Sequence, residues 1–256
     1  MTTRRLLLTI MLCVVPAFGA EAAPKPNIVF ILADDFGYMD VASYAARVRG
    51  VKRSDTFYET PNIDALADRG MSFTQAYACP VCSPTRASIL TGRFAAREGF
   101  TVAAPANIPT YFNQKRTPPQ GWRSHDMIIR PKPVTHALVN GTSSLALDRD
   151  ATTLAEALSA YDSAFIGKWH LGGHGAAGHQ PRDQGFTEIV YHDNGGLTYF
   201  NWRKPTKKRH ALHGGSMGKA GPDNTGADYL TDDYTVRAVR WLRRRAQTPK
   251  HPFFLY

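Results

Sequence analysis

Three short groups of residues have the side-chain types and spacing for chemistry on an anionic group. The first is a pair of adjacent carboxylates, the second a cysteine with an arginine four positions later, and the third a lysine and a histidine separated by one residue. These groups are Asp34-Asp35, Cys82 to Arg86 and Lys168 to His170. Carboxylates bind divalent cations, cysteine is a source of nucleophiles, and cationic side chains stabilise negative charge. An oxyanion, or an ester of one, is therefore the kind of substrate that these residues fit.

The predicted helix after Cys82 begins with Ser83 as its N-cap and Pro84 at its first position. Unpaired backbone N–H groups and the positive end of the helix dipole favour an anion at such a start. Arg86, at the third helical position, can reach back with a bidentate grip on the same oxyanion. The Cys79-Pro-Val-Cys82 spacing also suits a redox pair or half of a zinc site, and the residues alone leave both alternatives open.

Asp34 and Asp35 follow a continuous apolar run, residues 27–33, which is typical of a strand buried on both faces of a parallel sheet. Adjacent carboxylates repel each other unless a cation lies between them, and their oxygen atoms suit Ca²⁺ or Mg²⁺. A solvated acidic turn is the alternative. The carboxyl end of a parallel strand is also where open α/β sheets bind their ligands.

Lys168 and His170 come at the end of a second apolar strand, predicted over residues 164–168. The period-two alternation sends Lys168 and His170 to one side and Trp169 to the other, so a cation and an imidazole face one point. An exposed lysine and a histidine satisfied in the core would give the same pattern.

The rest of the sequence alternates between helical and strand patterns. Helices are expected over residues 61–69 with Thr60 as cap, over 152–158 with a Thr153–Glu156 capping box, and near 229–246. Strands are expected at 72–77, 188–191 and 251–256, and residues 97–147 form a long irregular excursion. This order predicts an α/β fold, a mostly parallel mixed sheet sandwiched by helices.

The composition is that of a globular protein, with 256 residues, 43% hydrophobic and 20% charged. The formal charge of +10 favours anionic partners, and a solvated basic surface is the alternative. The basic residues lack aromatic stacking platforms and a nucleic-acid motif, so no nucleic-acid partner is expected.

Residues 1–22 have the basic start, the short apolar run and the small-residue site of a secretory signal peptide. The apolar run is too short for a comfortable membrane span, so we expect an exported protein, periplasmic or secreted, without a stable membrane anchor. An uncleaved anchor is the alternative. Removal of Cys13 with the signal leaves only Cys79 and Cys82, too few for a disulfide framework.

These motifs together resemble the type I sulfatases of the alkaline-phosphatase-like superfamily. The stretch from Cys82 to Arg86 fits the Cys-x-Pro-x-Arg core, and Leu90-Thr91-Gly92-Arg93 follows it as in the family. The opening strand and Gly167 to Gly172 fit two further family blocks. The resemblance runs from Pro26 to Tyr256 and implies that residues 24–256 are the N-terminal part of a sulfatase catalytic domain, truncated before the C-terminal part.

The resemblance implies that a maturation enzyme converts Cys82 to formylglycine, whereas Cys79 lacks the required Pro and Arg offsets. The hydrated aldehyde would attack the sulfur of a sulfate ester, and its second hydroxyl would then expel sulfate. Asp34, Asp35 and the side chain at position 82 would bind Ca²⁺, with Mg²⁺ as the alternative, and the remaining metal ligands would lie beyond Tyr256.

The resemblance also assigns roles to three other side chains. Lys168 would bind formylglycine and sulfate oxygen atoms, His170 would hydrogen-bond the diol, and Arg86 would stabilise negative charge. The expected substrate is an aryl or carbohydrate sulfate, a small molecule or a glycan. The alternatives are a phosphodiesterase or phosphonate hydrolase of the same superfamily, or a non-catalytic remnant that binds sulfated glycans. As an N-terminal fragment, the chain is expected to show little turnover on its own.

Overall fold

The computed structural model describes residues 25–104, 143–144, 146–172, 178–193, 199–200, 225–248 and 251–256. The expected signal peptide, most of the irregular excursion and Cys13 lie outside these ranges. Within them, no helix is long and apolar enough to cross a membrane.

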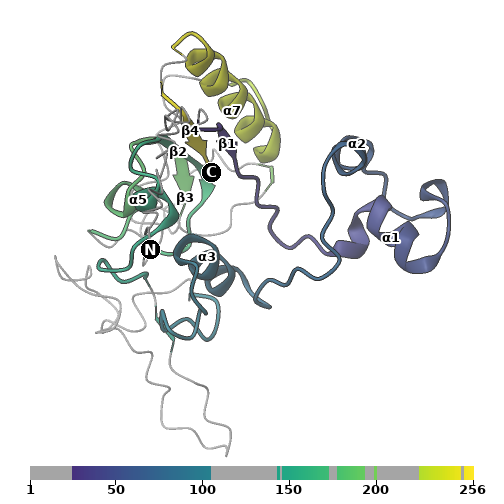
Figure 1. Ribbon diagram of the computed structural model, residues 1–256, viewed down its shortest axis with the longest axis horizontal. Helices are drawn as coiled ribbons and strands as arrows, with labels where there is room; N and C mark the ends of the chain where they lie inside the picture. The colour runs from purple at the N-terminus through teal and green to yellow at the C-terminus, as the bar shows by residue number, and fades with distance from the viewer. Residues whose placement is uncertain are drawn as a thin grey trace, which may run out of the picture.

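Within the described part of the chain, four parallel strands form the sheet, in the order β1-β4-β2-β3 (Figure 1). Their bounds are Ile28–Val29 for β1, Asp162–Lys168 for β2, Glu188–Asp193 for β3 and Phe253–Leu255 for β4. The last strand in sequence therefore lies between β1 and β2. All described strands are parallel, which confirms the predicted sheet, whereas the strand expected at residues 72–77 is wrong because that segment is irregular.

Helices cover both faces of the sheet, as predicted for an α/β fold (Figure 1). One face carries Phe165, Phe254 and Tyr256, which pack in one core with α3 (Cys82–Thr91) and α5 (Leu154–Ala157). The opposite face carries Ala164 and Leu255, which pack against Trp241 of α7 (Leu230–Ala246). Alternate residues of β2 and β4 thus enter two separate cores, as period-two geometry requires.

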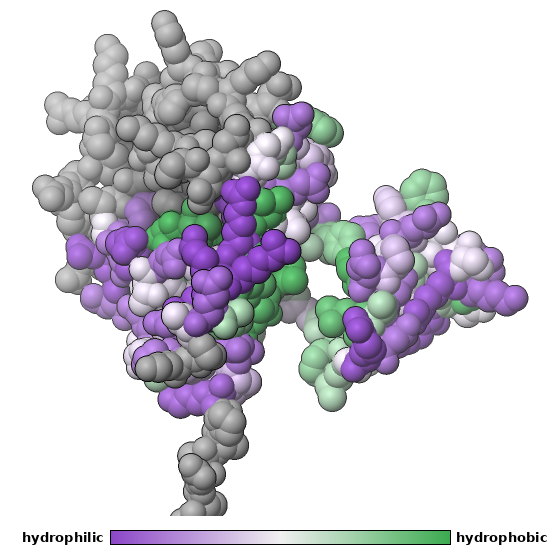
Figure 2. All heavy atoms as spheres, turned by 90° about the horizontal axis from the view of Figure 1, so that it is seen from above, coloured by the Kyte–Doolittle hydropathy of each residue, from purple (hydrophilic) through white to green (hydrophobic). Residues whose placement is uncertain are grey.

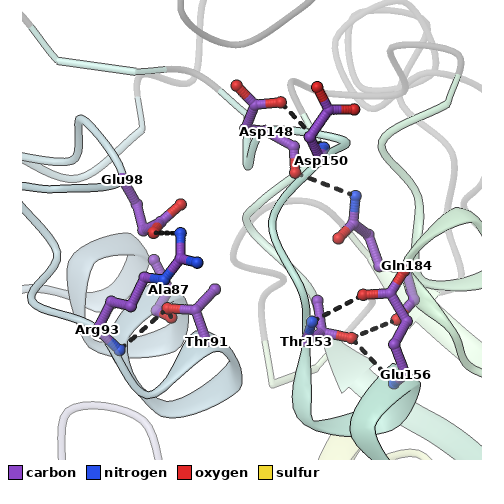
Figure 3. Close-up of polar contacts among 9 residues, drawn as sticks. All are labelled: Ala87, Thr91, Arg93, Glu98, Asp148, Asp150, Thr153, Glu156 and Gln184. Carbon is purple, nitrogen blue, oxygen red and sulfur yellow. Dashed lines mark hydrogen bonds and ion pairs between the residues drawn. The ribbon is translucent and has the colours of Figure 1, made fainter. Parts of the chain in front are cut away.

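The predicted capping box of α5 is present (Figure 3). Glu156 Oε2 accepts from Thr153 N at 2.7 Å, and Thr153 Oγ1 accepts from Glu156 N at 3.3 Å. The 3₁₀ helix η4 (Pro181–Gln184) ends against this box at Gly185, whose φ is 90°. A Cβ atom there would lie 2.5 Å from Glu156 Cγ, so only glycine fits this position.

The buried face of α7 holds an ion pair between Asp233 and Arg237. Arg237 Nε lies 2.7 Å from Asp233 Oδ2, and the two side chains are 4% and 0% exposed, respectively. The Thr225 hydroxyl also donates to Asp233. Because both charges are removed from water, each depends on the other for its solvation.

Helices α1 (Ala42–Arg49) and α2 (Pro61–Arg69) stand apart from the sheet, with 3₁₀ helices η1 (Tyr38–Asp40) and η2 (Arg53–Asp55) beside them (Figure 1). The start of α2 is as predicted, but Thr60 Oγ1 accepts from Ala42 N at 2.8 Å instead of capping its own helix. Figure 2 shows apolar residues on the surface of this arm. Its exposed apolar side chains include Phe57, Tyr58, Leu66, Met71, Phe73 and Tyr77.

Candidate functional site

Asp34 connects all three predicted groups, because it pairs with a residue of each of the other two. Its Oδ2 lies 2.5 Å from Lys168 Nζ, and its Oδ1 lies 3.4 Å from Arg86 Nη2. Asp34 follows β1 and Lys168 ends β2, so both residues lie at the carboxyl edge of the sheet. Two cations thus share one carboxylate, and the three side chains together keep a net positive charge that favours an anion.

Arg86 is held by more than this ion pair. Its side chain is 5% exposed, and its Nη1 donates to the backbone oxygen of Lys168 at 2.5 Å. The planar guanidinium therefore links α3 to the end of β2. This link fixes the start of α3 against the edge of the sheet where Asp34 lies.

The start of α3 differs from the prediction. The helix begins at Cys82 with Val81 as its N-cap, so Cys82 is the first helical residue and Arg86 the fifth. Ser83 does not cap the helix because it is buried and its Oγ accepts from Ala104 N at 3.0 Å. Residues four apart share one face of a helix, so Cys82 lies one turn before Arg86 on the same face.

The two cysteine side chains lie in different surroundings. Cys79 and Cys82 are both free thiols and both partly buried. Cys79 Sγ lies 3.7 Å from Ser88 Oγ, and its side chain packs against the core beneath α3. Cys79 therefore has a packing role, which leaves Cys82 as the cysteine at the helix start.

His170 is tied to the same region through Ala104. Its Nε2 lies 3.0 Å from the Ala104 carbonyl oxygen, while Ala104 N donates to Ser83. Because a carbonyl only accepts, Nε2 carries the proton and Nδ1 is the proton-accepting nitrogen of the neutral ring. Trp169 lies in the core and donates to the His179 carbonyl oxygen at 2.9 Å, on the side predicted from the alternation.

The backbone is strained at two of the predicted site residues. Asp35 and His170 have φ angles of 53° and 57°, and they are the non-glycine residues with positive φ in the described part of the chain. Such conformations cost about 1 kcal/mol or more and cluster at functional sites. His170 follows the end of β2 closely, whereas Asp35 lies in a turn further along the chain after β1.

Asp34 and Asp35 offer the oxygen atoms that Ca²⁺ prefers, but they do not form a complete shell. Asp35 is exposed and makes no ion pair within the described ranges. No group of three or more His, Cys, Asp or Glu side chains suited to a metal occurs among the described residues. The carboxylate oxygen atoms of Asp34 and Asp35 are therefore of the type that binds a hard cation, but a complete site needs further oxygen ligands.

The electrostatics of the edge keep Asp34 ionised. Burial alone would raise the pKa of Asp34, but the hydrogen bond from Lys168 and the charges of Arg86 and Lys168 outweigh it, so the pKa lies below its ordinary value of 3.8. A carboxylate that stays charged is the form that binds a cation.

Tyr256 belongs to this site, and the sequence patterns did not identify it. It follows β4 directly, is 8% exposed, and its pKa is raised by burial, although the nearby Arg86 guanidinium opposes the shift. A signal was present, because Tyr256 is the polar residue at the end of an apolar strand, as Lys168 is in β2.

A separate cavity of about 280 Å³ contains none of the predicted site residues. It is lined by Arg93, Arg97, Glu98, Gly99, Ser144, Asp148, Asp150 and Ala151. Figure 3 shows Arg93 beside Glu98, where Nη1 and Oε1 lie 3.2 Å apart. The neutralised pair lies away from Asp34, so the cavity is distinct from the site at the sheet edge.

Comparison with known proteins gives consistent matches. Arylsulfatase G of Rattus norvegicus is 31% identical over 265 residues, which cover 93% of this chain and 41% of the relative. N-acetylgalactosamine-6-sulfatase of Homo sapiens is 32% identical over 245 residues, which cover 93% of this chain and 40% of that relative. The crystal structure of Ps i-CgsB in complex with k-i-k-neocarrahexaose superposes with a TM-score of 0.62 and 28% identity over 91% of this chain and 44% of that one.

The chain thus spans about 40% of the length of the curated relatives that it matches. A family model described as Sulfatase matches residues 26–256, which include the described strands and all the predicted site residues. The chain therefore belongs to the sulfatase family.

Proposed function

We propose that this chain is the N-terminal part of a sulfuric ester hydrolase that cleaves aryl or carbohydrate sulfates. The observation that carries the proposal is the placement of Cys82 one turn before Arg86, whose guanidinium meets Asp34 and the backbone of Lys168. A nucleophile precursor thus lies at a helix start beside an excess of positive charge, which suits a sulfate group.

Cys82 is proposed to be the precursor of formylglycine. When matured, position 82 supplies a hydrated aldehyde as the oxygen nucleophile toward sulfur. Arg86 and Lys168 then hold the sulfate oxygen atoms and offset the negative charge that grows as the ester bond breaks. His170, oriented by the Ala104 carbonyl, would take at Nδ1 the proton that the second diol hydroxyl loses as that hydroxyl expels sulfate and restores the aldehyde.

The proposed metal is Ca²⁺, with Mg²⁺ as the alternative. Asp34, Asp35 and the side chain at position 82 would hold it, together with ligands outside the described residues. A divalent cation there would supply positive charge toward the sulfate and would offset the charges of the two adjacent carboxylates.

A carbohydrate sulfate is supported by two of the comparisons. One structural neighbour is described with a bound neocarrahexaose, and one curated relative is named for N-acetylgalactosamine 6-sulfate chemistry. Export through the predicted signal peptide and maturation by a formylglycine-generating enzyme complete the proposal.

The direct test is hydrolysis of 4-nitrophenyl sulfate by the full-length protein that contains this chain, co-expressed with a formylglycine-generating enzyme, with Ca²⁺ present. We expect nitrophenol release that is abolished in Cys82→Ala and retained in Cys79→Ala, since Cys79 only packs in the core. Release from bis-4-nitrophenyl phosphate at a higher rate would favour the phosphodiesterase alternative. Binding of the sulfate ester without any release would favour the glycan-binding remnant.

A further inference from the structure

Tyr256 occupies a fixed position beneath the proposed site. Its ring stacks on Phe30 with a centroid distance of 5.3 Å and an interplanar angle of 6°, and on Phe165 at 5.2 Å and 12°. Phe30 continues β1, because its N–H donates to Leu255 O at 2.7 Å, and Phe165 lies in β2. The phenol is therefore held between the two strands whose ends carry Asp34 and Lys168.

The hydroxyl of Tyr256 lies beside the Arg86 guanidinium. Two of the three guanidinium nitrogen atoms have assigned partners, since Nη1 donates to Lys168 O and Nη2 pairs with Asp34. Within the described ranges, neither Arg86 Nε nor Tyr256 Oη makes a hydrogen bond of acceptable geometry, and both atoms are buried. The two side chains are nevertheless close enough for Arg86 to act on the phenol.

Burial of two polar atoms without hydrogen-bond partners lowers the stability of the folded state. A hydrogen bond between the two atoms would remove that cost. Arg86 Nε carries an N–H, and Tyr256 Oη is an acceptor. The aromatic stack on Phe30 and Phe165 holds the phenol ring in place. The third edge of the guanidinium is then fixed as firmly as the two edges that meet Asp34 and Lys168.

We propose that Tyr256 is a positioning residue that holds Arg86 through an Nε–H to Oη hydrogen bond, and thereby sets the direction of the guanidinium toward the sulfate group. The contact itself is independent of the reaction. Its consequence for turnover rests on the proposed function.

The contact is tested by NMR of arginine side chains in the full 256-residue chain labelled with ¹⁵N, where Arg86→Lys identifies the Arg86 signal by its loss. In the protein with Tyr256, we expect the Arg86 Nε–H to exchange slowly with water. In Tyr256→Phe, this exchange should be roughly tenfold faster, because one hydrogen bond from a charged group is lost. Tyr161→Phe is the matched control, because Tyr161 packs against the same core before β2. It should leave the signal unchanged.

Tyr256→Phe keeps the ring and its stacking, so the variant removes only the hydroxyl. An Arg86 Nε–H signal with the same shift and exchange rate in Tyr256→Phe would overturn the proposal, as would an equal change in Tyr161→Phe. In matured protein that hydrolyses 4-nitrophenyl sulfate, kcat should fall about tenfold in Tyr256→Phe with little change in KM, because the guanidinium acts mainly in the transition state. If the NMR effect is present and the full-length, matured protein with Tyr256 in place hydrolyses no ester, the proposed function fails and the contact stands.

Discussion

Asp34 Oδ2 lies 2.5 Å from Lys168 Nζ, although 134 positions separate the two residues in sequence. The strands that they follow are not neighbours, because β4 lies between β1 and β2. The ion pair therefore spans the end of β4, where Tyr256 lies. One carboxylate, two cations and a phenol meet at this edge because three parallel strands end there and α3, which carries Arg86, packs beside them.

The low pKa of Asp34 gives a pH dependence of stability. A folded-state pKa below the ordinary 3.8 means that the contribution is fully present above about pH 4 and is lost as the pH falls through the folded-state pKa. Urea unfolding at pH 7 and pH 3, with EDTA present, should show a smaller loss of stability on acidification for Asp34→Asn than for the unmodified chain. Equal losses in both proteins would show that the ion pairs do not stabilise the ionised carboxylate.

Lys168→Met removes the charge and keeps most of the apolar stem. We expect kcat/KM for 4-nitrophenyl sulfate to fall about 100-fold or more, as when one group that stabilises transition-state charge is removed. The pKa of Asp34, followed by carboxyl ¹³C NMR, should rise because one of its two cationic partners is lost. Lys52→Met is the control, since Lys52 is exposed on the arm. Unchanged turnover in Lys168→Met would exclude the proposed role of the ammonium group.

Asp233→Ala should be strongly destabilising. It leaves Arg237 buried on α7 without its carboxylate, and breaking such a pair costs about 3–5 kcal/mol. Asp232→Ala, at the exposed neighbouring position in the same helical turn, should change the free energy of unfolding by less than about 0.5 kcal/mol. Chemical denaturation followed by circular dichroism compares the two variants. Similar midpoints for both would show that the ion pair is not stabilising in the folded state.

The parallel α/β fold could be predicted because apolar strands and amphipathic helices alternate along the sequence. The capping box at Thr153 and Glu156 was also predictable, since its spacing is local. The strand at residues 72–77 was wrong because a strand needs a neighbour, and local β propensity does not supply one. The prediction of Ser83 as the N-cap was wrong because it also used local sequence alone. Its hydroxyl accepts from Ala104, a contact that no local pattern encodes.

The groups of the candidate site were predictable as types of residue, but their arrangement was not. Motif spacing identified Asp34, Arg86 and Lys168, whereas the shared carboxylate depends on the strand order. Tyr256 was missed because a tyrosine that ends an apolar run fits an ordinary core residue equally well. Its ring position is fixed by stacking on Phe30 and Phe165, which lie far apart in sequence.

The central claim concerns the chemical state of position 82. The most direct measurement is the mass of the tryptic peptide from Gly70 to Arg86, taken from protein purified as the fraction that hydrolyses 4-nitrophenyl sulfate and then alkylated. We predict one alkylated thiol, at Cys79, and an aldehyde in place of the thiol at position 82. A peptide from that active fraction with two alkylated thiols and no aldehyde would contradict the claim.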